Sequence, residues 1–176
     1  FVFLVPAVTM RLIAEEKRTG TIELLVTWPV TDAQIVIGKY IGAVLFVGIM
    51  LLATLPLALM VGALGKMDVG VAIGGYLGLF LLGGAFAGVG LMASSWTRNQ
   101  IVAYLVGALL CAFFYFIDGA LGLLWDGARD FFAGLSFKAH FQNVARGVVD
   151  LRDLVFYGSF IAIALIVTTL SLQARN

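Results

Sequence analysis

Few side chains in this 176-residue sequence could carry out acid–base, nucleophilic or metal chemistry. The one histidine is His140, and the one cysteine, Cys111, lies within an apolar run. No cluster of Cys, His or acidic residues stands near His140 at the spacing that metal ligands require, so we predict no metal site and no catalytic residue. A lone histidine of this kind is more often a surface or interfacial residue.

Asp118, in FFYFIDGALGLL, is the only acidic residue well inside an apolar run. A carboxylate at the centre of a bilayer is costly and is usually functional. Because Asp118 stands about seventeen residues into its run, a place near the outer headgroups or at a cavity mouth is favoured over a proton relay. An intramembrane enzyme that uses Asp118 or His140 as an acid or base is one alternative, although a single candidate acid is little for catalysis.

Glycines recur at four-residue spacing in the second long apolar run, and they include Gly74, Gly78, Gly84 and Gly88. Small residues at this spacing allow helices in lipid to approach closely. We therefore predict a packing role for these four, against another helix of the chain or a second copy. The segment GVGLMA that begins at Gly88 fits a dinucleotide-binding fingerprint in form, but no strand precedes it, so nucleotide binding is not expected.

The composition argues against a soluble domain. Hydrophobic residues make up 62% of the chain and charged residues 12%, whereas soluble domains have about a quarter charged. The formal net charge of +1 gives no basic field to attract nucleic acid. The chain contains no GxxxxGK(S/T) phosphate-binding loop, so any ATP-driven activity would need a partner protein. We predict a membrane protein surrounded by lipid.

Four apolar runs are long enough to cross a bilayer, which takes roughly 20 helical residues. They cover residues 40–64, 69–93, 101–124 and 154–172. Residues 1–13 are apolar but too short, and we interpret them as the end of a span whose beginning is missing. Because the runs do not alternate as barrel strands do, the predicted fold class is all-α, a polytopic transmembrane helical bundle in a single domain.

Residues 14–38 are the most polar part of the first half of the chain. Thr31 and Gln34 form a capping box, which predicts a helix that begins near Asp32. Just upstream, the apolar residues of TIELLVTW fall at helical spacing, so we expect a short helix with one apolar face. Such a face is either a docking surface or an anchor on the lipid headgroups.

Residues 125–153 are interpreted as an amphipathic segment on the outer side of the membrane. Apolar residues recur there at three- and four-residue steps, at Phe137, Phe141, Val144, Val148 and Leu151. This periodicity predicts one or two helices that lie in the outer leaflet ahead of the last span.

The distribution of Lys and Arg indicates only weakly which side of the membrane each loop faces. If residues 14–38 face the cytoplasm, that side carries six basic residues and the other side carries five. The five lie mostly in one long segment, where the positive-inside rule has less force.

A pattern in the polar segment runs from Glu15-Glu16 through Gly20-Thr21, Glu23 and Leu25 to Pro29 and Gly38-Lys39. It resembles the first cytoplasmic loop of ABC-2 type transporter permeases. In that family the loop joins the second and third transmembrane helices of a type V exporter-like bundle. It contains a coupling helix that fits a cleft on the ATP-binding subunit. The resemblance implies contacts with an ATPase partner at a set of loop residues, namely Glu15, Glu16, Gly20, Thr21, Glu23, Leu24, Leu25 and Pro29.

A second pattern lies before the last span, in LSFKAHFQNVARGVVDLRDLVFY. It comprises Ser136, His140, Phe141, Arg146, Gly147, Val148, Arg152 and Asp153. This pattern is similar to the segment before the final helix in the gliding-motility, GldF-like, branch of the same permeases. Phe137 departs from it, since proline follows the serine in that branch.

Together these resemblances imply the membrane-spanning subunit of an ATP-driven exporter in a bacterial cytoplasmic membrane. The chain would hold no cofactor, because ATP and Mg²⁺ would bind to a separate ABC ATP-binding subunit. A second permease copy or a related permease would complete a dimer surrounded by lipid, and no nucleic-acid partner is expected. The remaining alternative is a non-transporting membrane scaffold whose loop docks a soluble partner.

Overall fold

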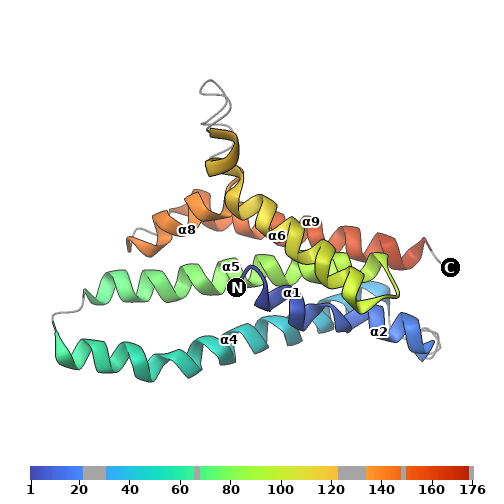
Figure 1. Cartoon of the computed structure of the whole chain (residues 1–176), viewed down its shortest axis with the longest axis horizontal. Coiled ribbons are helices and arrows are strands. Elements are labelled where there is room, and N and C mark those ends of the chain that lie inside the picture. Colours follow the sequence, from blue (N-terminus) through green and yellow to red (C-terminus); the bar gives the residue numbers. More distant parts are fainter. Residues whose placement is uncertain (22–30, 66–67, 123–133, 148–149, 175–176) are drawn as a thin grey trace.

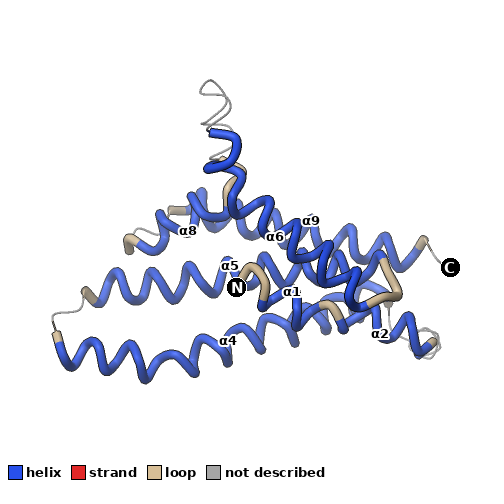
Figure 2. Tube along the Cα trace, viewed as in Figure 1, coloured by secondary structure: helices blue, strands red, loops and turns tan. Residues whose placement is uncertain are grey.

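A computed structural model of the chain describes residues 1–21, 31–65, 68–122, 134–147 and 150–174, with the backbone alone for 120–122. The described residues form helices joined by turns and short loops (Figure 2). The helices are α1 (Leu4–Thr9), α2 (Arg11–Thr19), α4 (Asp32–Leu64), α5 (Val69–Trp96), α6 (Gln100–Gly122), α8 (Phe137–Ala145) and α9 (Leu151–Gln173).

Four helices, α4, α5, α6 and α9, are long and apolar enough to cross a membrane. They overlap the four apolar runs, and the predicted all-α bundle is confirmed. Much of their surface is apolar and exposed, as at Leu45 and Leu59 of α4, which is expected of side chains that face lipid. The chain is therefore an integral membrane protein.

Helix α5 is the centre of the bundle. It contacts α1, α2, α4, α6, α8 and α9. Figure 1 shows it between α4 on one side and α8 and α9 on the other. An aromatic core lies where these helices meet, because Phe137 of α8 packs against Phe86 of α5 and Tyr157 of α9, with ring centroids 5.4 and 5.9 Å apart.

The four glycines of α5 that the sequence pattern selected, Gly74, Gly78, Gly84 and Gly88, lie against other helices of the same chain. A Cβ on Gly74 would overlap the carbonyl oxygen of Val144, at the end of α8, and one on Gly78 would lie 3.1 Å from the Phe141 ring. Further along α5, a Cβ on Gly84 would lie 3.3 Å from the Tyr40 hydroxyl of α4. On Gly88 it would lie 3.3 Å from Ala164 of α9. Small residues allow these close approaches.

The first helical segment extends beyond residue 13. Helix α2 continues to Thr19, so residues 14–19 of the polar segment are helical. Gly20 ends the helix in the left-handed conformation, with φ of 74°, which glycine adopts without steric cost. The polar segment therefore leaves the bundle one to two turns later than its apolar pattern suggests.

Helix α4 begins at Asp32, as the capping box predicts. The Thr31 hydroxyl accepts a hydrogen bond from the Gln34 N–H at 3.4 Å, and the Gln34 side chain accepts one from the Thr31 N–H at 3.0 Å. These bonds satisfy backbone donors that the first turn of a helix leaves free. The helix then continues without interruption through Pro56.

Candidate functional site

One end of the bundle gathers polar groups from four helices. The last turns of α2, α5 and α9 meet there with the start of α4, at the right of Figure 1. Helix α2 ends and α4 begins at this same end, on either side of residues 22–30 in the sequence. The contacts at this end determine how the polar segment is attached to the spanning helices.

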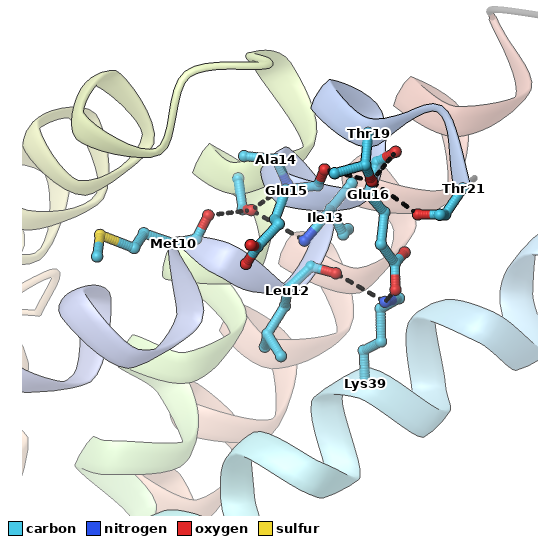
Figure 3. Close-up of polar contacts among 10 residues, drawn as sticks. Met10, Leu12, Ile13, Ala14, Glu15, Glu16, Thr19, Thr21 and Lys39 are labelled. Carbon is cyan, nitrogen blue, oxygen red and sulfur yellow. Dashed lines mark hydrogen bonds and ion pairs between the residues drawn. The ribbon is translucent and has the colours of Figure 1, made fainter.

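An ion pair joins the two sides of the polar segment. The Lys39 ammonium of α4 contacts the Glu16 carboxylate of α2 (Figure 3). It also donates to the Leu12 carbonyl at 2.7 Å. Both charged side chains are largely covered, with 16% of Lys39 and 27% of Glu16 exposed. Partial burial reduces solvent screening, so this pair contributes more than a pair on an open surface.

A second connection joins α2 to α5 and α9. The Lys17 ammonium donates to the Ser95 carbonyl, and the Ser171 hydroxyl of α9 donates to the same carbonyl at 3.2 Å. Lys17 is buried in spite of its charge. Because three helices converge on one carbonyl, a movement of α2 would be transmitted to α5 and α9.

The residues that the sequence assigns to partner contact fall into two groups. Glu15 and Glu16 are half-buried on α2, whereas Gly20 and Thr21 are exposed just after it. The Thr19 hydroxyl donates to the Glu15 carbonyl at 3.0 Å and lies 2.9 Å from the Thr21 hydroxyl (Figure 3). The remaining four, Glu23, Leu24, Leu25 and Pro29, lie outside the described residues.

The sequence interpretation missed the residues that hold this end together. Lys17 and Lys39 donate to carbonyls that lie 78 and 27 residues away in the sequence, so no local spacing indicates these partners. The pair Ser94-Ser95 at the end of a long apolar run was the one available signal, because buried hydroxyls in a helix must find acceptors.

The opposite end of the bundle contains a buried pair. His140 of α8 lies with Nδ1 2.5 Å from Asp153 Oδ1 of α9, and its Nε2 is 3.1 Å from the Gly134 carbonyl. The imidazole stacks on Phe156 at a centroid distance of 3.9 Å. The expectation that His140 is a surface or interfacial residue is corrected, since only 5% of it is exposed within the bundle. The cause is Asp153, a charged partner from the next helix.

Other residues of the second pattern shape the turns around this pair. Ser136 caps α8 by accepting from the Ala139 N–H, and Gly147, with φ of 83°, follows the end of that helix beside Gly70. Arg146 and Arg152 are exposed. Phe137, at the position where proline was expected, is fully buried in the aromatic core.

The predicted apolar stripe of this segment is only partly continuous. Phe137 and Val144 are buried and Phe141 is half-buried, which agrees with one face of α8 packed on α5. Val148 lies outside the described residues. Leu151 departs from the stripe, because it begins α9 and is 73% exposed.

Asp118 lies near the end of α6 and is half-buried. Its Oδ1 atom has no hydrogen-bond partner among the residues that the structure describes. Within those residues no group of three or more His, Cys, Asp or Glu side chains could hold a metal ion.

The chain is similar to one known family of membrane proteins. A family model described as ABC-2 family transporter protein matches residues 1–142, which is most of the chain. No curated protein matches the chain closely enough to count as a relative.

Proposed function

Because the chain belongs to the ABC-2 family of transporter proteins, we propose that a separate ATPase binds the segment between α2 and α4 and drives transport through it. Membrane subunits of this family are not enzymes themselves, carry no cofactor and generally pair with ATP-binding subunits. The intramembrane-enzyme alternative is therefore set aside. In this proposal, residues 20–25 are the coupling helix or adjoin it, and Glu15, Glu16 and Glu23 supply nearby polar contacts.

The observation that carries the proposal is the attachment of this segment to the bundle. Glu16 is paired with Lys39 of α4, and Lys17 donates to the carbonyl of Ser95 on α5. A force on residues 22–30 would therefore act on α2 and α4 together and reach α5 and α9 directly. Coupling of this kind requires a rigid element that has two arrangements.

Four finer assignments belong to the same proposal, namely the branch of the family, the dimer, the membrane and the direction of transport. The second pattern, from Ser136 to Asp153, supports the GldF-like branch of the family. Two copies of the chain, or this chain and a related permease, would enclose the transport path in a bacterial cytoplasmic membrane, and movement would be outward. The exposed apolar faces of the spanning helices are compatible with a dimer contact as well as with lipid.

The direct test uses the chain purified together with a candidate ABC ATPase, chosen as one that co-purifies with the wild-type chain. Leu25→Arg places a charge on the expected docking face, and Glu23→Ala removes a polar contact. An interface anchor contributes about 2 kcal/mol or more, so Leu25→Arg should weaken assembly about 30-fold or more and reduce ATP hydrolysis with it.

Gln142→Arg is the matched control, because Gln142 is an exposed residue of α8 at the other end of the bundle. It should leave assembly and ATP hydrolysis unchanged. If Leu25→Arg and Glu23→Ala also leave both unchanged, the docking role is wrong. A non-transporting scaffold would bind the ATPase but would not stimulate its ATP hydrolysis. Stimulated hydrolysis therefore distinguishes the transporter from the scaffold.

A further inference from the structure

A serine of α5 lies within the backbone hydrogen-bond ladder of the first helical segment. In an uninterrupted helix the Ala14 N–H would donate to the Met10 carbonyl, four residues earlier. Here the Ser94 hydroxyl lies between these groups. It donates to the Met10 carbonyl at 2.8 Å and accepts from the Ala14 N–H at 2.9 Å and the Ile13 N–H at 3.1 Å.

This insertion coincides with the break between two helices. Helix α1 ends at Thr9 and α2 begins at Arg11, so Met10 alone separates them. A side chain inserted into the ladder is an established cause of helix kinks. Met10 itself keeps helical dihedrals, with φ of −55° and ψ of −29°, so the backbone is close to that of a continuous helix.

Two arrangements of this joint satisfy the same polar groups. In the observed one, the Ser94 hydroxyl completes the ladder. In the other, the Ala14 N–H would bond directly to the Met10 carbonyl, and the Ser94 hydroxyl would turn to the Gly90 carbonyl of its own helix, a bond that serine commonly makes. The Ile13 N–H would then bond to the Thr9 carbonyl, four residues earlier, as in an uninterrupted helix. With that bond, the donors and acceptors of the joint stay paired in both arrangements.

The joint separates a fixed part of the chain from the part that leads to the polar segment. Helix α1 is held in the core, where Thr9 and Val5 are buried. Gly90 admits Thr9 so closely that a Cβ on the glycine would overlap the threonine hydroxyl. Beyond the joint, α2 carries Glu16 and Lys17 and ends at Gly20.

We propose that Ser94 is the positioning residue of a hinge between α1 and α2. When an ATPase acts on the segment beyond α2, the Ala14 N–H would change its acceptor from the Ser94 hydroxyl to the Met10 carbonyl. This change would alter the tilt of α2 relative to α1. This inference rests on the proposed coupling function, and it identifies the two-state element that such coupling needs.

The test measures the position of the end of α2 against α6. Spin labels are placed at Arg18→Cys and Leu109→Cys, both at exposed positions, while the native Cys111 is fully buried and does not compete. Arg18 stands eight residues beyond Met10, an arm of about 12 Å, so a change of about 20° in the kink moves it by about 4 Å. Ser94→Ala should shift the Arg18–Leu109 distance by about this amount and make it insensitive to ATP in the complex.

Ser95→Ala is the matched control. The Ser95 hydroxyl is equally buried but donates to the Met92 carbonyl within α5, at 2.7 Å. It should retain the wild-type distance and the wild-type response to ATP, and Ser94→Thr, which keeps the hydroxyl, should do the same. An unchanged distance in Ser94→Ala, or an equal shift in Ser95→Ala, overturns the inference.

The wild-type chain tests the proposed hinge even if Ser94→Ala fails to fold. With the ATPase bound, the Arg18–Leu109 distance should change when ATP is added. A constant distance alongside active ATP hydrolysis would overturn the hinge and leave the coupling function standing. Failure of the ATPase to assemble with the wild-type chain would instead overturn the coupling function itself, and the role of the hinge with it.

Discussion

Replacement of Asp153 by alanine is expected to lower the free energy of unfolding by about 3–5 kcal/mol, because it removes one partner of a buried, hydrogen-bonded pair of ionisable side chains. Asp153 is 1% exposed and contacts Nδ1 of His140. A carbonyl can only accept, so the bond to Gly134 places a proton on Nε2 of His140. Without Asp153, the buried Nδ1 atom of His140 would lose its hydrogen-bond partner, and the missing side chain would leave a cavity beside it.

The measurement is thermal unfolding of the purified protein in detergent or lipid nanodiscs. Asp150→Ala is a control, since that side chain caps α9 at an exposed position and its loss should cost only about 1 kcal/mol. The double variant His140→Phe with Asp153→Leu should recover much of the stability, because apolar residues of similar volume often replace a buried pair without loss. Equal costs for the single and double variants would contradict this account of the pair.

Reversal of the charge at Glu16 is expected to be the most damaging change at the other end of the bundle. Glu16→Lys would place two ammonium groups together in a partly buried site, and juxtaposed like charges cost several kcal/mol. The connection between α2 and α4 should open, and stimulation of ATP hydrolysis in the complex should fall.

The exchanged variant, Glu16→Lys with Lys39→Glu, tests whether pairing is the cause. It restores opposite charges but loses the bond from Lys39 to the Leu12 carbonyl, so recovery of both stability and ATP hydrolysis should be partial. If the exchanged variant is no better than Glu16→Lys alone, the ion pair does not join the helices in the way described.

Local patterns in the sequence were sufficient to predict the four long helices, α4, α5, α6 and α9. Apolar runs of about 20 residues can satisfy their backbone groups in lipid only as helices, and the bundle follows from that requirement. The capping box at Thr31 fixed the start of α4 because both of its bonds lie within four residues. Features that depend on a few neighbouring residues could therefore be predicted from the sequence.

The polar connections could not be predicted in the same way. Lys39 reaches Leu12 and Ser94 reaches Met10 across 27 and 84 residues, and the relative placement of the helices decides both contacts. His140 was misjudged for a related reason. Asp153 lies 13 residues away in another helix, so no helical spacing links the two side chains.

The proposed function requires that the polar segment faces the cytosol, where an ATPase can reach it. Single cysteines at Thr21, beside that segment, and at Gln142, on α8, are exposed positions for a membrane-impermeant maleimide. In sealed vesicles of defined orientation, Thr21→Cys should react only when the cytoplasmic face is outward, and Gln142→Cys only when the opposite face is outward. Labelling of Thr21→Cys from the non-cytoplasmic side would contradict the account.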